Sequence, residues 1–258
     1  MTNLHRIGMC LIFALIISCS TRDEEPEAVL VLPKSLTSKS PQGDHTTYYN
    51  YIEGNKLKST VRNGRVTSER FYTDNLITKS ISYNDLGEIT FQFTYEYANN
   101  RLAKSNIGTG ILNYSIYFTW INNDHVSIED DSVKPAGTIN KTEVYFSNGN
   151  IVKTTNYHHA PNYYTITEVN IIENDTKNNP FKNIEGHSLI TFDTKGDFFS
   201  QAHNITKITT TRRGTVNGEP FSEDYFRTFS YKYSDQMFPI DYTVNSSYGS
   251  SYIYEFAY

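Results

Sequence analysis

The sequence predicts an all-β protein, a long antiparallel meander of roughly 12 to 15 strands that curls into a flattened or open-sided barrel. Segments of alternating aromatic and polar residues recur along the chain, and turn signals follow one another every ten to thirteen residues or so, roughly one strand apart. No stretch keeps helical periodicity over about three turns. The 21 Tyr and 15 Phe residues agree with this class, because aromatic side chains favour strands.

Residues 1–18 have the layout of a lipoprotein signal peptide. Arg6 precedes an apolar run, Ile7–Ile17, which is too short to span a bilayer at ~1.5 Å per residue. The segment Ile16–Cys19 resembles a bacterial lipobox, with an aliphatic, a variable and a small residue before the cysteine. The resemblance implies that Cys19 becomes the first mature residue and carries the lipid. An ordinary signal peptide with an incidental cysteine is the alternative.

Residues 19–27 are expected to form an acidic tether between this anchor and the fold. Asp23, Glu24 and Glu25 lie a few residues after Cys19, a pattern that resembles the surface-export signal of some gram-negative lipoproteins. The resemblance implies an outer-membrane, lipid-anchored protein displayed on the cell surface. An acidic tether can also be merely soluble, so display on the inner or outer leaflet stays open.

Residues 28–258 are predicted to form a single all-β domain. Its first strand is expected at Val29–Lys34, where Pro33 stops an apolar run. The clearest strand lies within Tyr83–Tyr97, where a turn at Asn84–Gly87 precedes strict alternation. One predicted face is buried and comprises Phe91, Phe93, Tyr95 and Tyr97, together with Phe118 and Trp120 from a later strand. Thr90, Gln92 and Thr94 are expected to face water.

Turn signals and further strands follow in order along the chain. Turns are predicted at residues 53–55, 63–64, 74–75, 86–87, 99–100, 122–124, 148–150, 195–196 and 217–218. Alternating strands are predicted at Tyr114–Trp120, Tyr225–Tyr233 and Tyr252–Tyr258. Two interruptions, His158–Asn162 and Glu173–Gly186, are expected to be long loops because each contains a proline.

Three units resemble YD-type hairpin repeats, in which Tyr-Asp and a turn glycine precede an aliphatic strand start. They are Tyr51–Leu57, Tyr83–Ile89 and Tyr97–Leu102, although no tyrosine that opens these units is followed by aspartate. With the lipobox, the chain resembles a family of gram-negative β-rich lipoproteins of unknown function. That resemblance implies an architecture and a location, and no active site.

An aromatic face of this size must be covered, and without helices the sheet itself has to provide the cover. A membrane-crossing barrel is disfavoured because the other face carries Lys, Glu, Asn and Thr. Nucleic acid is not expected as a partner, since the net charge is −5 and the one dense basic spot is Arg212 with Arg213.

Two groups of residues could hold a metal ion on paper. His158 and His159 are adjacent, yet neighbours on a strand point apart and no third ligand has suitable spacing. Glu129–Asp131 lacks the Asp-x-Asx-x-Asx-Gly pattern of a calcium loop, so a solvated turn is the expected reading. No metal and no cofactor is predicted.

A hydrolytic triad can also be assembled on paper from His187, Ser188 and Asp193, or from His203 with any serine. No G-x-S-x-G elbow accompanies them, so no catalytic residue is predicted and the protein is not expected to be an enzyme, with a hydrolase as the remote alternative.

The predicted function is therefore a cell-envelope binding or adaptor module, whose tyrosine-lined hollow holds a glycan or a peptide. A structural envelope lipoprotein without a small ligand is the alternative, and an envelope protein is a further candidate partner. Exposure of the single tryptophan, Trp120, in a concavity would favour the binding reading, and a buried Trp120 the structural one.

Overall fold

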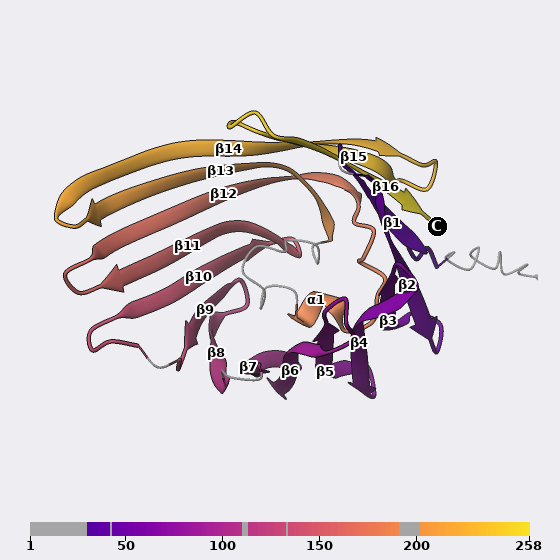
Figure 1. Cartoon of the computed structure of the whole chain (residues 1–258), viewed down its shortest axis with the longest axis horizontal. Helices are drawn as coiled ribbons and strands as arrows, with labels where there is room; N and C mark the ends of the chain where they lie inside the picture. Colours follow the sequence, from indigo (N-terminus) through magenta and orange to yellow (C-terminus); the bar gives the residue numbers. More distant parts are fainter. Residues whose placement is uncertain (1–29, 42, 110–112, 133, 191–201) are drawn as a thin grey trace, which may run out of the picture. The chain divides into compact units, whose positions relative to one another are not determined.

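The structure is a computed structural model that describes residues 30–41, 43–109, 113–132, 134–190 and 202–258. Residues Val31–Tyr258 form one compact unit. Within it the described residues form sixteen antiparallel strands, which follow one another in sequence order around a closed barrel (Figure 1). The predicted signal peptide, Cys19 and the acidic tether lie outside the described residues.

The strands are β1 Ser35–Lys39, β2 His45–Ile52, β3 Lys56–Arg62, β4 Arg65–Thr73, β5 Leu76–Tyr83, β6 Ile89–Ala98, β7 Arg101–Gly108, β8 Asn113–Asn122, β9 His125–Asp130, β10 Ile139–Ser147, β11 Asn150–Ala160, β12 Tyr164–Asn178, β13 His203–Val216, β14 Glu219–Tyr233, β15 Pro239–Ser246 and β16 Ser251–Ala257. One short helix, α1 His187–Ile190, lies between β12 and β13.

The predicted all-β meander is confirmed, and it closes completely. The first strand, β1, pairs with β2 on one side and with the last strand on the other, in a register that runs from Ser35 opposite Ala257 to Lys39 opposite Ile253. The open-sided form is therefore wrong. The sixteen strands exceed the predicted number because β1 and β9 are short and lack aromatic alternation.

The predicted opening strand at Val29–Lys34 is also wrong, since the described residues 30–34 are not in a strand. Pro33 has no N–H to donate, so Lys34 is the first residue to bond to the closing strand, through its N–H to the carbonyl of Ala257 at 2.7 Å. The carbonyl of Pro33 accepts a bond from the Tyr51 hydroxyl at 2.8 Å. The proline therefore fixes where the chain enters the barrel.

The predicted turns connect the strands as expected wherever the structure describes them. Asn63 and Gly64 have φ angles of 52° and 73°, and Asn217 and Gly218 have 52° and 84°. Two successive positive φ angles define the hairpin turn whose twist matches the flanking strands, and Asn-Gly suits it best. The turn predicted at Lys195–Gly196 lies outside the described residues.

The prediction of a long loop is wrong for His158–Asn162, and the loop predicted at Glu173–Gly186 begins later, at Asn179. His158 and His159 belong to β11, and only a tight turn after Ala160 separates it from β12. β12 continues to Asn178, and the chain leaves it at Asn179 and Pro180. The end of β12 pairs with β13 alone, from Glu173 opposite Lys207 to Asn178 opposite His203, and this pairing outweighs the weak local preference of Glu173–Asn178 for strand.

The predicted inward face of β6 is confirmed except at its first member. The larger core cluster contains Tyr95 and Phe118 as buried residues, with Phe93, Tyr97 and Trp120 packed against it. The prediction for Phe91 is wrong, because 47% of its surface is exposed. Its ring lies 6.3 Å from that of Phe93, so it faces the same way at the start of the strand, where fewer neighbours cover it.

The segment Asn179–Ile190, which we call the plug, crosses the barrel interior. Phe181 and Ile184 belong to a second core cluster with Leu57, Tyr242 and Phe256, whereas Ile190 belongs to the first. Figure 1 shows α1 within the ring of strands. The side chains of the plug join both clusters. The plug therefore fills interior space that the strand side chains alone would fill in a smaller barrel.

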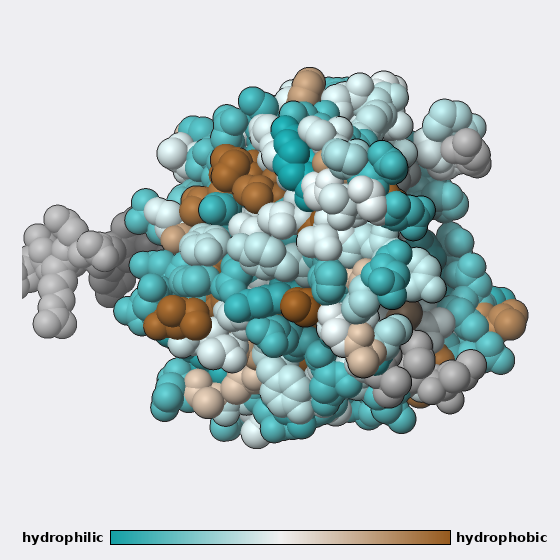
Figure 2. All heavy atoms as spheres, turned by 90° about the vertical axis from the view of Figure 1, so that its left-hand side faces the viewer, coloured by the Kyte–Doolittle hydropathy of each residue, from teal (hydrophilic) through white to brown (hydrophobic). Residues whose placement is uncertain are grey.

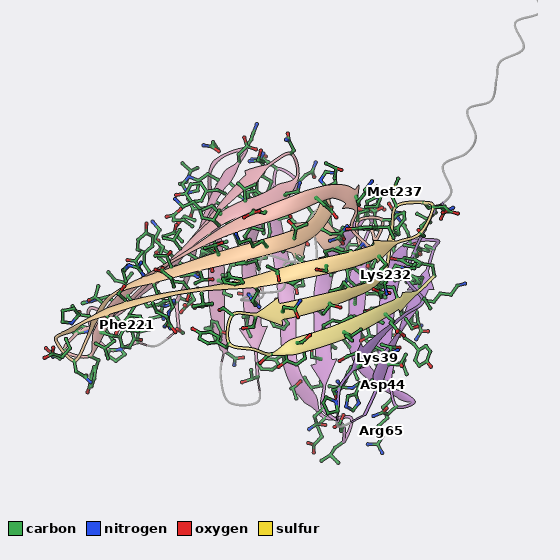
Figure 3. All side chains as sticks on the ribbon, turned by 90° about the horizontal axis from the view of Figure 1, so that it is seen from above. Lys39, Asp44, Arg65, Phe221, Lys232 and Met237 are labelled. Carbon is green, nitrogen blue, oxygen red and sulfur yellow. The ribbon has the colours of Figure 1, made fainter. Side chains whose placement is uncertain are left out.

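The outer wall carries ion pairs together with exposed apolar side chains such as Ile171 and Phe226. Cross-strand ion pairs join Lys39 with Glu255, Lys104 with Glu96, Lys141 with Glu129, Lys207 with Glu173, Arg213 with Asp224 and Lys232 with Asp241. Figure 3 looks onto the strands that carry Lys39 and Lys232, and the face in Figure 2 is mostly hydrophilic with separate small apolar groups. The two apolar clusters thus lie inside the barrel, and these ion pairs lie on its outer wall.

Lysine side chains lie over some of the outward aromatic rings. Lys79 lies over the ring of Phe71 at 5.5 Å and Lys104 over that of Tyr117 at 5.7 Å. These contacts shield apolar surface while the ammonium groups stay in water. Among the described residues, no helix has the length and apolar character needed to cross a membrane.

Candidate ligand-binding cavity

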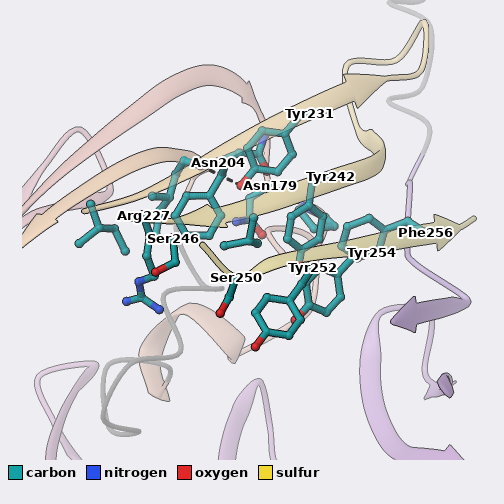
Figure 4. Close-up of a pocket in the computed structure, with 15 residues that line it drawn as sticks. Asn179, Asn204, Arg227, Tyr231, Tyr242, Ser246, Ser250, Tyr252, Tyr254 and Phe256 are labelled. Carbon is teal, nitrogen blue, oxygen red and sulfur yellow. Dashed lines mark hydrogen bonds between the residues drawn. The ribbon is translucent and has the colours of Figure 1, made fainter. Parts of the chain in front are cut away.

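A cavity of about 280 Å³ lies inside the barrel against the inner faces of β13 to β16 (Figure 4). Its lining comprises Asn179, Pro180, Asn204, Ile205, Ile208, Arg227, Phe229, Tyr231, Tyr242, Val244, Ser246, Ser250, Tyr252, Tyr254 and Phe256. The cavity can hold a group the size of a sugar ring.

Stacked tyrosines form the apolar wall of the cavity. The rings of Tyr242 and Tyr254 lie 4.6 Å apart at 11°, and Tyr231 stacks on the other side of Tyr242 at 5.4 Å. Cross-strand register aligns them, because Tyr242 is opposite both Tyr231 and Tyr254. Burial raises the pKa values of Tyr231 and Tyr254, so both hydroxyls stay protonated at neutral pH.

The start of the plug forms the floor. Asn179 is 4% exposed, and its side-chain oxygen accepts the N–H of Phe181 at 2.9 Å, which makes the turn that ends β12. Asn204 is equally enclosed, and its side-chain amide donates to the carbonyl of Asn178 at 3.1 Å. These bonds hold two amide groups rigidly beside Pro180 at the bottom of the cavity.

The rim combines an aromatic face with polar groups. Tyr252 is 48% exposed, and Ser246, Ser250 and Arg227 lie beside it (Figure 4). The Ser246 hydroxyl accepts the N–H of Tyr248 at 3.2 Å, which fixes the turn between β15 and β16. The ring of Tyr252 is therefore presented to the cavity and to solvent at the same time.

Trp120, which was expected to report on a binding site, lies elsewhere in the barrel. Its indole N–H donates to the carbonyl of Leu102 at 3.0 Å, its ring stacks on Phe146 at 5.8 Å, and the guanidinium of Arg101 lies over it at 4.6 Å. Trp120 therefore serves packing. The sequence predicts a tyrosine-lined hollow and the strands that carry Tyr231, Tyr252 and Tyr254, whereas β15 with Tyr242 is not among the predicted strands.

The two adjacent histidines point apart, as expected for a strand. His158 contacts the side chain of Asn140 at 3.1 Å, and His159 contacts that of Thr165 at 2.7 Å. In the part of the chain that the structure describes, no group of three or more His, Cys, Asp or Glu side chains could hold a metal ion.

The carboxylates of Glu129–Asp131 each have a separate partner. Glu129 pairs with Lys141, Asp130 with Lys134 at 2.7 Å, and Asp131 accepts the N–H of Ser115 at 2.5 Å. Partial burial alone raises the pKa of Asp130, but the bonds from Lys134 and from the nearby serine outweigh it and hold the pKa below its ordinary value.

The described residues do not form the hydrolytic triad that was considered from the sequence. The Nδ1 atom of His187 contacts a guanidinium nitrogen of Arg70 at 2.9 Å, and His203 contacts Asn150 at 2.9 Å. Ser188 lies exposed on α1, and Asp193 lies outside the described residues. Burial, and then the charge of Arg70, hold the pKa of His187 well below its usual value, so this imidazole is neutral and structural.

Comparisons with known proteins show a similarity in fold only. The sequence matches no protein-family model and no curated protein. The barrel resembles the crystal structure of a porin-like protein from Bacteroides vulgatus, with a TM-score of 0.57 and 10% identity over 88% of this chain and 98% of that one. A porin-like protein from Bacteroides uniformis aligns over 90% of this chain and 99% of that one, with a TM-score of 0.38 and 12% identity.

Proposed function

We propose that this chain is a lipid-anchored protein of the outer membrane, displayed at the cell surface, whose barrel binds a glycan in the cavity between the plug and β13 to β16. The observation that carries the proposal is the half-exposed ring of Tyr252 on the rim of a tyrosine-lined cavity. Aromatic faces stack on the apolar faces of sugar rings, and hydroxyl and amide groups satisfy the sugar hydroxyls.

A glycan fits this cavity better than a peptide. The space of about 280 Å³ suits a single ring with its substituents, whereas an extended peptide needs a long groove or a free sheet edge for its backbone. Inside the described barrel β1 to β16 are paired in a continuous ring, so the cavity offers no strand edge.

The outer-membrane address is supported by the fold likeness to a porin-like protein and by the lipobox at Cys19. The likeness does not extend to pore formation. Porins have an apolar outer band and a polar lumen, whereas this barrel has two apolar clusters inside and ion pairs on its outer wall. Placing outward lysines such as Lys104 and Lys141 in lipid would cost about 2 to 4 kcal/mol each near the bilayer midplane.

The proposal is tested by isothermal titration of the protein with a panel of neutral and acidic oligosaccharides. Tyr252→Ala should abolish the heat of binding or weaken the affinity roughly 5- to 150-fold, in line with the ~1 to 3 kcal/mol of a lost aromatic contact in a binding site. Tyr157→Ala is the matched control, because Tyr157 is 40% exposed on the outer wall. Equal affinities of the two variants for every bound oligosaccharide would contradict the proposal.

A structural envelope protein without a small ligand is the second candidate, and the packed position of Trp120 favours it. On that view the cavity is only a packing defect of a large barrel. The same titration separates the two functions, since a structural protein gives no saturable heat with any member of the panel.

A further inference from the structure

Arg227 faces the barrel interior. The other inward-facing positions of β14 are aromatic or acidic. Arg227 pairs with Ile208 of β13, which is 1% exposed in the core, and with Ser246 of β15. Directly paired residues share a face of the sheet, so the Arg227 side chain lies on the cavity side. Two residues further along β14, Phe229 packs against both core clusters.

Other cations of β13 and β14 have carboxylate partners. Lys207 pairs with Glu173, Arg212 with Glu168 and Glu223 at 3.3 and 3.0 Å, Arg213 with Asp224, and Lys232 with Asp241. Arg227 has no ion pair with any described residue. Among the described residues that line the cavity, it is the only charged side chain, with no aspartate or glutamate beside it.

The guanidinium is well placed for a charged ligand group. Figure 4 shows Arg227 beside Ser246, with Ser250 and Tyr252 further along the same rim. Arginine presents a planar set of donors that matches a carboxylate in two parallel hydrogen bonds, and Arg227 is exposed, so a ligand can reach it. A ring lying against Tyr252 would carry its acidic substituent toward Arg227.

We infer that the glycan bound here is acidic, a sugar of the uronic-acid class whose ring stacks on Tyr252 and whose carboxylate pairs with Arg227. The inference rests on the proposed function and adds the chemical class of its ligand. A sulfate ester offers the same charge to the guanidinium, with tetrahedral instead of planar geometry, and is distinguished by the test.

The test is isothermal titration of the full chain, wild type and variants, with trigalacturonate, its methyl ester, neutral galactotriose and a sulfated galactose trimer. Wild type should bind trigalacturonate tightest. Arg227→Gln should weaken that binding roughly ten- to a hundredfold and leave the methyl ester unchanged, because only the charged bond is lost. Arg213→Gln, which removes an outward guanidinium, is the matched control and should bind like wild type.

The outcomes separate this inference from the proposed function. Equal affinity for the acid and its ester, with both weakened by Tyr252→Ala, overturns the acidic ligand and leaves a neutral glycan. Unchanged acid binding in Arg227→Gln also overturns it. Tighter binding of the sulfated trimer replaces the carboxylate by a sulfate. Absence of binding by all four probes overturns the acidic ligand and counts against glycan binding itself.

Discussion

Replacing Phe181 with alanine should strongly destabilise the barrel, because this ring fixes the plug to the wall. It is 7% exposed and lies 5.7 Å from the ring of Tyr49, 5.6 Å from that of His187 and 6.0 Å from that of Phe256. Truncation of a buried phenylalanine to alanine costs about 3 to 5 kcal/mol. For a domain of this size, that corresponds to a fall in melting temperature of about 6 to 20 °C.

Urea denaturation followed by circular dichroism measures the loss, with Phe226→Ala as the matched control. Phe226 is 46% exposed and faces outward opposite Thr209, so its truncation should cost about 1 kcal/mol or less. Midpoints are compared at equal m-values, since a changed m-value reports altered compactness instead of altered stability. Similar losses for the two variants would refute the placement of the plug inside the barrel.

Three further predictions concern the plug, its histidine and the anchor. Gly186→Ala should lower the free energy of unfolding by ~2 kcal/mol more than Gly64→Ala. Both glycines have a positive φ, but of the two only Gly186 would bring a Cβ against a carbonyl, that of Asn75 at 2.9 Å. Equal denaturation midpoints for the two variants would show that this close approach is absent. His187 stays neutral in the fold, so unfolding takes up a proton below about pH 6.5. The free energy of unfolding should therefore fall on acidification by up to about 1.4 kcal/mol per pH unit. His187→Gln should flatten that slope in thermal melts between neutral and acidic pH. Cys19→Ala should abolish metabolic labelling by palmitate, and persistent labelling would remove the lipoprotein reading.

The strand order of this barrel could be predicted from the sequence because its turns are encoded locally. Asn-Gly at 63–64 and 217–218 tolerates the positive φ angles of hairpin turns, and alternation on β6 defines which face is buried. Phe91 shows the limit of that pattern, because its exposure depends on which neighbours cover the start of the strand and not on its own identity.

The plug could not be predicted, since its contacts are distant in sequence. Asn183 donates to the carbonyl of Val31 at 2.9 Å, and the amide of Asn55 donates to the carbonyl of Asn183 at 3.0 Å. Arg227 was visible as the cation within the aromatic alternation of β14. The role of Arg227 could be inferred only from the strand register, which places this residue on the cavity side and away from the carboxylates of the outer wall.

The central claim is that the barrel wall meets water and that lipid alone attaches the protein to the membrane. Temperature-induced phase separation of a nonionic detergent tests this directly on a protein of residues 28–258, which lacks Cys19. Outward ion pairs such as Arg213 with Asp224 predict that this protein stays in the aqueous phase with a strand-rich circular dichroism spectrum. Partition of the folded protein into the detergent phase would contradict the account.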